Sequence, residues 1–96
     1  MPAAHRLGDN NTGHDSCPPV ALSTASSNVI TNGRGQGRLG DSYNPHSCKV
    51  HPSHSGTVSS ASSTVFVNGR GAARIGDSVS CGGTAAAGSE NVFIGG

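Results

Sequence analysis

The sequence predicts an all-β fold, a small body with approximate threefold symmetry. Two stretches, NVITNGRGQGRLGD at 28–41 and TVFVNGRGAARIGD at 64–77, align without gaps. In each, β-branched and aromatic residues run directly into Asn-Gly, which is a strong signal for a tight hairpin turn. No stretch shows the 3.6-residue periodicity of an amphipathic helix. The sequence therefore predicts repeated β-hairpins in a single domain, residues 1–96.

The third copy of the repeat is split between the two ends of the sequence. GSENVFIGG at 88–96 repeats the lead-in and the strand, and PAAHRLGD at 2–9 repeats the returning half. We expect residues 91–94 to pair with residues 3–7. This pairing would close a ring of three hairpin units and remove a free sheet edge, which would otherwise invite aggregation.

Each returning half ends in Arg-(Leu/Ile)-Gly-Asp. The glycine predicts a bend, and the aspartate can open a turn by bonding its own backbone. The repeated charged residues are Arg6, Arg38 and Arg74 with Asp9, Asp41 and Asp77. The pattern fits solvated arginines, and it fits equally well arginines that pair with the aspartates of neighbouring units or cap the wider end.

The composition predicts a domain that is poor in core. Hydrophobic residues make up 32% of the sequence, Trp is absent and Gly occurs 15 times. Small domains of this kind usually need a metal, disulfides or oligomerisation. The formal net charge of +1 gives no electrostatic case for binding nucleic acid or an anionic membrane. No apolar run approaches the roughly 20 residues that span a bilayer, and there is no secretory signal.

Three links follow the Gly-Asp turns, and four of the five histidines lie in them. In a threefold body these links converge at one end. His14 and His46 each lie five residues after the preceding turn aspartate, and Cys81 lies four residues after its own. His54 and Cys81 each lie seven residues before the next lead-in. The alignment therefore predicts that these four side chains meet.

The predicted ligands His14, His46, His54 and Cys81 form a Cys-His₃ set, which suits a closed tetrahedral Zn²⁺ site of the structural kind. Iron can be held by the same ligands. His51 competes with either histidine of the second link, because the sequence does not fix the phase of that link. The alternative for all these histidines is exposed polar loop decoration.

Cys17 and Cys48 are less favoured metal ligands, and His5 is expected to play no part in the metal site. Without a secretory signal, we expect reduced thiols rather than one disulfide and one free thiol. Cys17 lies close to His14 in HDSCPP, but a small buried apolar side chain is the favoured interpretation, and Cys48 is a less favoured ligand as well. His5 occupies a strand position and is expected at the surface.

The motifs PAAHRLGD, NGRGQGRLGD and NGRGAARIGD together resemble the PAAR-repeat family. TGH at 12–14 and CGG at 81–83 are also similar to the metal loops of that family. The resemblance covers essentially the whole sequence. It departs where His5 precedes Arg6, where Gly35, Gln36 and Gly37 replace Pro-Ala-Ala, and where Gly71 replaces Pro. We expect these departures to lie on the strand surface, away from the ligands.

The resemblance implies a short cone with zinc near its tip, held by three histidines and one cysteine. It also implies a partner, since the broad base of such a cone sits on the blunt end of a trimeric β-helical spike. The spike would be VgrG-like or that of a phage, with one cone per trimer. These spikes belong to type VI secretion systems and to contractile phage baseplates.

The implied role is structural, because the cone sharpens a spike that is driven through a membrane. That role involves transient puncture and no stable membrane anchoring. We expect a protein made in the cytoplasm and delivered outward on the spike, or carried in a virion. With no extension on either side of the domain, we expect no fused toxin.

Two other classes of function fit parts of the sequence. A zinc hydrolase, or a Cys81 nucleophile paired with a histidine, would need an open metal position or an activating base. Four protein ligands leave no open position, and Asp15 is the one carboxylate beside the proposed ligands. A stand-alone metal-binding module would need no partner. We expect no enzymatic activity.

Overall fold

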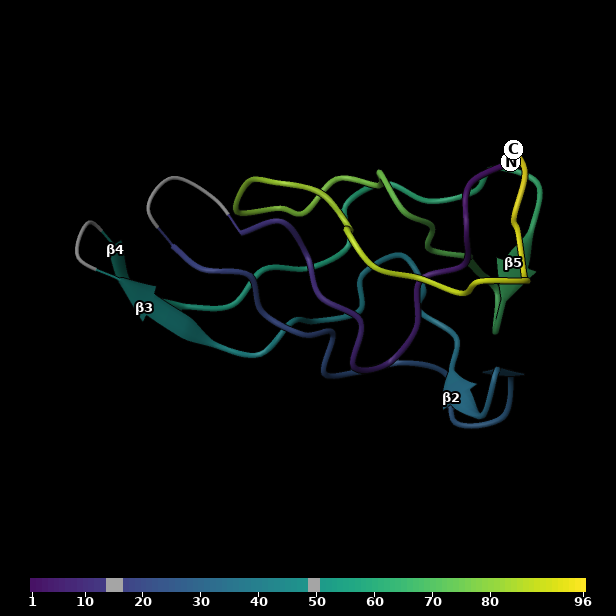
Figure 1. Ribbon diagram of the computed structural model, residues 1–96, viewed down its shortest axis with the longest axis horizontal. Helices are drawn as coiled ribbons and strands as arrows, with labels where there is room; N and C mark the ends of the chain where they lie inside the picture. The colour runs from purple at the N-terminus through teal and green to yellow at the C-terminus, as the bar shows by residue number, and fades with distance from the viewer. Residues whose placement is uncertain (14–16, 49–50) are drawn as a thin grey trace.

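Short antiparallel β-strands are the regular elements of the fold. The computed structural model describes residues 1–13, 17–48 and 51–96, and it describes only the backbone of 46–48 and 51–54. Within these residues there are six strands and no helix, which confirms the all-β prediction. The molecule measures 37 × 23 × 23 Å. Its long axis runs from the hairpin of β3 and β4 to the end where both termini lie (Figure 1). No helix among the described residues could cross a membrane.

Two hairpins form where the sequence predicts them. Strand β1 (Ile30–Thr31) pairs with β2 (Arg34–Gly35), and β5 (Phe66–Val67) pairs with β6 (Arg70–Gly71). In both turns the Asn and the Gly have positive φ. A two-residue turn with two positive φ values matches the twist of the flanking strands, and Asn-Gly is the pair that tolerates it best.

A third hairpin lies in the second link, outside the repeated strands that the sequence predicts. Strand β3 (His46–Cys48) pairs with β4 (His51–His54), and the register shifts between its two printed pairs. His46 lies opposite His54, and Cys48 lies opposite His51.

Much of the remaining backbone pairs through isolated bridges rather than along extended strands. Ala3 forms an antiparallel bridge with Phe93, and Arg6 forms one with Gln36. The bridge between Ala3 and Phe93 joins the two ends of the chain, which lie side by side in Figure 1. Among the described residues, no strand is longer than the four residues of β4.

Three backbone segments meet in a closed ring of hydrogen bonds. The His5 amide donates to the Ala73 carbonyl at 3.0 Å, Ala73 donates to Gly37 at 2.9 Å, and Gly37 donates to His5 at 2.9 Å. Gln36 lies beside the ring, is 2% exposed, and its Nε2 lies 3.1 Å from each of the three carbonyl oxygens. The three repeats are thus joined where their returning halves cross.

The expectation that the departures from the family motif lie on the strand surface is wrong, because all of them are buried: His5, Gly35, Gln36, Gly37 and Gly71. His5 is fully buried, its Nδ1 lies 2.7 Å from the Ala87 carbonyl, and its Nε2 lies 2.9 Å from the Tyr43 hydroxyl. The matching positions in the other repeats are Gly37 and Ala73. These small residues leave room inside the molecule for one imidazole. The local sequence around His5 does not predict this burial, because the space depends on residues from the other two repeats.

The core consists of two small clusters. One contains Leu22, Tyr43, Val58, Ala73 and Val79, with Val20 and Cys81 packed against it. The other contains Ala4, Val67, Ala72 and Ile94, so it joins residues from both ends of the chain. Both clusters lack bulky aromatic groups other than Tyr43, as the composition predicts.

Candidate functional site

Cys81 is the one proposed metal ligand whose side chain the structure describes. It is a free thiol, partly buried, and packed against the cluster that contains Tyr43 and Val79.

The backbone of the other two links comes close to Cys81. A Cβ built on Gly56, two residues after β4, would lie 2.7 Å from the Cys81 Sγ. The amide of Thr12 donates to the carbonyl of Thr84 at 2.8 Å, and a Cβ on Gly83 would lie 2.6 Å from the Thr12 Oγ1. The segments next to His54, His14 and Cys81 in the sequence therefore converge.

The proposed histidine ligands are only partly covered by the structure. His14 lies outside the described residues, and so do the side chains of His46, His51 and His54. The backbone places His46 and His54 directly opposite each other in the β3–β4 hairpin. Among the side chains that the structure does describe, no group of three metal-binding residues occurs.

Cys17 corrects the expectation that the thiols are reduced. It is 5% exposed and disulfide-bonded. Cys17 is thus buried as expected, but it acts as a cross-link rather than as a simple apolar side chain. The absence of a secretory signal was the basis for expecting thiols, and it says nothing about local geometry.

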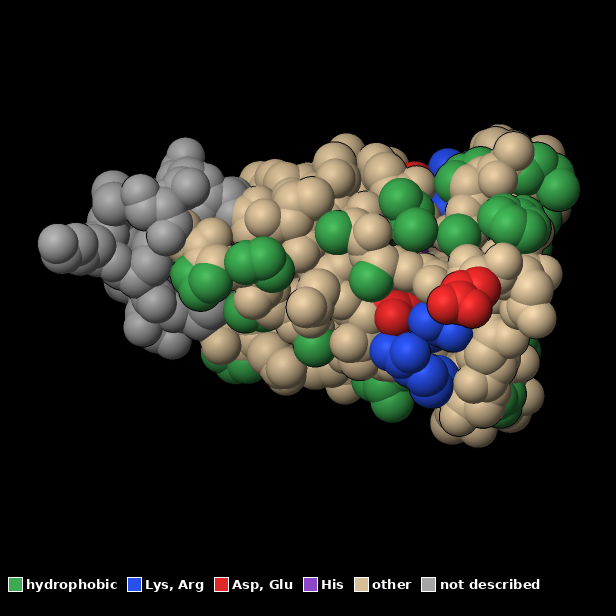
Figure 2. Space-filling model, in the orientation of Figure 1, with side chains coloured by type: hydrophobic (Ala, Val, Ile, Leu, Met, Phe, Trp, Pro, Cys, Tyr) green, Lys and Arg blue, Asp and Glu red, His purple; other side chains and the backbone are tan. Residues whose placement is uncertain are grey.

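The end of the molecule opposite β3 and β4 carries exposed hydrophobic side chains. Ile30, Phe66 and Phe93 occupy the same position in the three repeats, and they are 56%, 61% and 51% exposed. Val29, Val65 and Val92 precede them and are also exposed. Figure 2 shows hydrophobic side chains gathered at this end, where β5 and both termini lie. We call Ile30, Phe66 and Phe93 the apolar triad.

The repeated arginines are engaged with carboxylates rather than solvated. Arg6, Arg38 and Arg74 each bind the aspartate three residues later, and their side chains are 11%, 16% and 15% exposed. Arginines of adjacent hairpins add contacts, since Arg34 binds Asp9 and Arg70 binds Asp41. Each aspartate therefore pairs with the arginine of its own turn, and Asp9 and Asp41 also pair with an arginine of a neighbouring repeat.

The Asp9 carboxylate shows the electrostatic effect of this pairing. Burial by itself would raise the pKa of Asp9, but the side-chain and backbone hydrogen bonds from Arg6, with the charge of Arg34, lower the pKa overall. Arg6 Nη1 also donates to the Asn32 Oδ1 at 3.0 Å. The turns are thus tied to the neighbouring hairpin.

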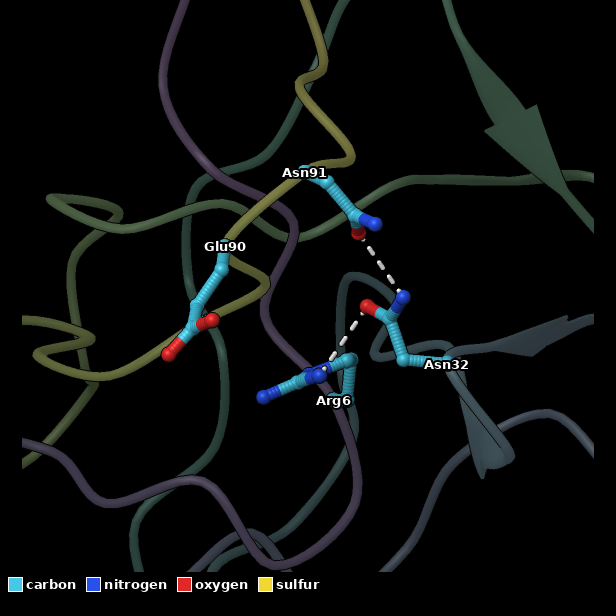
Figure 3. A pocket seen from close by; sticks show the side chains of 5 residues that line it. Arg6, Asn32, Glu90 and Asn91 are labelled. Atoms are coloured by element: carbon cyan, nitrogen blue, oxygen red, sulfur yellow. Dashed lines mark hydrogen bonds between the residues drawn. The ribbon is translucent and has the colours of Figure 1, made fainter.

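A polar pocket of about 300 Å³ lies at the seam between the first hairpin and the chain ends. It is lined by Arg6, Asn32, Gly88, Glu90 and Asn91. Figure 3 shows Asn32 bridging Arg6 and Asn91, with its Nδ2 2.9 Å from the Asn91 Oδ1. Because Arg6, Asn32 and Asn91 are hydrogen-bonded to one another, we interpret the pocket as part of the contact between repeats.

These features define a small all-β domain in which the same turns and hairpins recur, with one apolar end and with cysteine and histidine links at the other. The chain belongs to the PAAR motif family, whose model matches residues 49–96. This confirms the resemblance drawn from the motifs. The first half, outside the match, carries related motifs in PAAHRLGD and NGRGQGRLGD. None of the curated proteins compared with the chain matches it.

Sequence reasoning missed three features near these sites: the β3–β4 hairpin, the buried His5 and the central Gln36. The second link has no Asn-Gly and few β-branched residues, so it carries no strand signal of the usual kind. Gln36 could have been noticed as the single large polar residue at a position where the other repeats have alanine.

Proposed function

We propose that this protein is a structural spike tip that caps and sharpens a trimeric β-helical spike of a contractile injection machine. The machine would be a type VI secretion system or a phage baseplate. Family membership supports this proposal, because PAAR proteins form a structural spike-tip family. In this role the protein is made in the cytoplasm and leaves the cell, or enters the virion, on the spike. It punctures a membrane transiently and is not an enzyme.

The observation that carries the proposal is the apolar triad. A monomer that caps a trimer of identical chains must offer each chain a similar surface. Ile30, Phe66 and Phe93 are large, exposed and at matching positions of the repeat. Exposed hydrophobic residues gathered at one end of a small protein mark an interaction surface. Three similar units with the third split between the termini, forming a cone with its base here, would meet this requirement.

We further propose that the opposite end is held by a structural Zn²⁺ ion. His14, His46, His54 and Cys81 would bind it, with His51 as the alternative in the second link. Two observations support the fit: Gly56 of the second link lies beside the Cys81 sulfur while Thr12 of the first link contacts Gly83 and Thr84, and His46 lies opposite His54. Three imidazoles and one thiolate are ligands that Zn²⁺ prefers, and a closed shell would cross-link the links where the core is thin. Iron could occupy the same ligands.

The partner is tested by measuring the mass of the complex with a purified spike trimer from the same genome. We expect one copy of this chain per trimer. Phe66→Ser should weaken binding at least tenfold, and the triple change of the apolar triad to Ser should abolish it. Leu39→Ser, which alters an exposed hydrophobic residue of a turn, is the matched control. Three copies per trimer, or tight binding to a monomeric protein, would contradict capping.

The metal is tested by elemental analysis and thermal unfolding of the purified protein. We expect about one Zn²⁺ per chain and a large loss of stability on chelation. His14→Ala, His46→Ala, His54→Ala and Cys81→Ala should each remove the metal. His51→Ala should retain it, and the opposite result for His51 and His54 would assign the alternative ligand. A stably folded protein that binds no transition metal would refute the site.

A further inference from the structure

The three Arg-(Leu/Ile)-Gly-Asp turns are built alike around their aspartates. In each turn the arginine donates from Nε to one carboxylate oxygen and from Nη2 to the other. The two distances are 2.8 and 3.1 Å for Arg6 and Asp9, 2.9 and 2.9 Å for Arg38 and Asp41, and 3.1 and 3.0 Å for Arg74 and Asp77. Each glycine has φ near +90°, so the turns also share a backbone shape.

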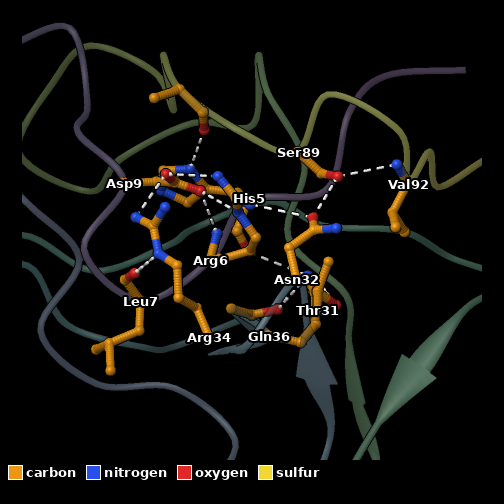
Figure 4. Close-up of polar contacts among 12 residues, drawn as sticks. His5, Arg6, Leu7, Asp9, Thr31, Asn32, Arg34, Gln36, Ser89 and Val92 are labelled. Carbon is orange, nitrogen blue, oxygen red and sulfur yellow. Dashed lines mark hydrogen bonds and ion pairs between the residues drawn. The ribbon is translucent and has the colours of Figure 1, made fainter.

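Two of these turns hold a second arginine, which comes from the returning strand of the adjacent hairpin. Arg34 donates from Nε to the Leu7 carbonyl at 2.8 Å and from Nη2 to the Asp9 Oδ1 at 2.8 Å (Figure 4). Arg70 repeats these contacts with the Leu39 carbonyl at 2.7 Å and the Asp41 Oδ1 at 3.3 Å. One guanidinium therefore spans a carbonyl and a carboxylate in each case.

The second arginine also covers the turn glycine. A Cβ built on Gly8 would lie 3.0 Å from the Arg34 Nη2, and one built on Gly40 would lie 3.1 Å from the Arg70 Nη2. A guanidinium close to the turn glycine therefore indicates that a second arginine is bound in that turn.

In the third turn the same position is open. The Ile75 carbonyl accepts no hydrogen bond from any described residue, and no described atom lies within 4 Å of a Cβ built on Gly76. Among the described residues, Arg74 is the one arginine that binds Asp77. Arg74 and Asp77 are nevertheless placed as in the other two turns.

A hydroxyl group does not take the place of the second arginine. Ser60 Oγ donates to the Asp77 Oδ1 at 3.2 Å. Thr24 Oγ1 donates to the Asp41 Oδ1 at 3.1 Å, in a turn that also holds Arg70. The carboxylate in this setting therefore accepts a hydroxyl and two arginines together, and Asp77 retains capacity for one more donor.

We propose that the Ile75 carbonyl, Gly76 and the Asp77 carboxylate form a docking site for an arginine side chain of a partner protein. A guanidinium presents two N–H donors in a fixed fork, whereas the ammonium of lysine is a point charge that cannot span the two acceptors in the same way. The Ile75 side chain is 36% exposed, so it can pack against the apolar stem of that arginine. Arginine binding at this site does not require a spike, so its test is independent of the spike-tip role.

The site is tested by NMR titration of the full chain with N-acetylarginine amide, with N-acetyllysine amide at equal ionic strength as the control. We expect the amide resonances of Ile75, Gly76 and Asp77 to shift with saturation in the arginine titration. The resonances of Gly8 and Gly40 should stay in place, because Arg34 and Arg70 already occupy those turns. Equal shifts at all three glycines, or equal shifts with the lysine compound, would overturn the proposal.

An engineered second site provides a gain-of-binding control. Arg70→Gln removes the guanidinium from the Asp41 turn while leaving the turn itself intact. In this variant we expect Gly40 to respond to N-acetylarginine amide as Gly76 does in the parent protein, with Gly8 still silent. Asp77→Asn should reduce the Gly76 response several-fold. If Arg70→Gln folds and Gly40 does not respond, the open turn is not a guanidinium site.

Discussion

At the scale of the residue, the position before the repeated arginine decides how the repeats meet. His5, Gly37 and Ala73 occupy it, and their backbones close the ring of hydrogen bonds. One imidazole fills the space beside a glycine and an alanine. A Cβ on Gly37 would lie 2.8 Å from the His5 carbonyl oxygen and 2.9 Å from the Leu22 Cδ2. The ring therefore tolerates one large side chain and no more.

The buried His5 predicts a loss of stability in acid. Burial lowers its pKa below 6.5, against the Ala87 hydrogen bond and the charges of Asp9 and Asp77, while the charge of Arg6 adds to the lowering. Below about pH 6.5 the unfolded chain binds a proton that the folded chain does not, so the free energy of unfolding falls as the pH falls, by up to about 1.4 kcal/mol per pH unit.

Urea unfolding at a series of pH values between 7.5 and 5 measures this effect. His5→Gln should unfold at lower urea concentration than the parent at neutral pH, and it should show a shallower decline in acid. The other histidines are unchanged in both proteins, so the difference in slope belongs to His5. Equal slopes would show that His5 takes up its proton in the folded state.

Gln36 and Thr31 predict a coupled pair of substitutions. The Thr31 hydroxyl donates to the Gln36 Oε1 at 2.8 Å, and both residues are buried. Gln36→Ala should cost about 2 kcal/mol, because it opens a cavity and leaves the hydroxyl without its acceptor. Adding Thr31→Val reproduces the pair that Val67 and Ala72 form in the second repeat. A double-mutant cycle should give a coupling near 1 kcal/mol, and strictly additive losses would contradict this view.

At the scale of the element, the hairpins owe their shape to the Asn-Gly turns. Asn32 and Asn68 have φ values of 54° and 53°, a conformation that costs most other residues about 1 kcal/mol or more. Their side chains also join repeats, since Asn68 accepts from the Arg38 Nη1 at 3.2 Å and donates to the Asn28 Oδ1 at 2.9 Å. Each asparagine is thus both a turn residue and a contact.

Two substitutions of Asn68 separate these roles. Asn68→Gly and Asn68→Ala both lose the contacts with Arg38 and Asn28, but only the alanine is strained at positive φ. We expect the alanine variant to be less stable than the glycine variant by about 1 kcal/mol, measured by urea unfolding. If the two variants were equally stable, the turn conformation would not limit stability at this position.

Local signals made the hairpins predictable, and non-local packing made the rest hard to predict. Asn-Gly after β-branched residues specifies a turn within a few residues, so β1, β2, β5 and β6 follow from the sequence. The burial of His5 depends on three segments that meet only in the folded chain. The convergence of the links followed from the spacing of the repeat, and the backbone beside Cys81 agrees with it. The ligand set itself stays a prediction.

At the scale of the whole molecule, the two chain ends pair with each other and share one core cluster. Ala4 donates to the Val92 carbonyl at 2.9 Å, and Ile94 donates to the Pro2 carbonyl at 2.9 Å. Ile94 also belongs to the cluster that contains Ala4. The chain ends thus share backbone pairing and core, and neither end can be packed without the other.

Removing residues 91–96 should therefore unfold the protein. The deletion takes away the partners of Ala4 and Pro2 and removes Ile94 from its cluster, which also exposes a strand edge. We expect no cooperative thermal transition by circular dichroism. The matched control deletes only Gly95 and Gly96 and should cost little more than the bonds that their carbonyls accept from Ser62, Ser63 and Arg74. A cooperative transition in the longer deletion would show that folding does not require the pairing of the two chain ends.

The ring of His5, Gly37 and Ala73 breaks the threefold symmetry of the molecule, and this affects how a complex should be imaged. An imidazole, a hydrogen atom and a methyl group stand at three matching positions, so the molecule has no true rotation axis. In the proposed complex, the imidazole would point toward each chain of the symmetric trimer equally often across a population of particles. A cryo-EM map averaged about the threefold axis would blend the three side chains into one density. Only a reconstruction without imposed symmetry, with particles sorted by rotation, would separate them.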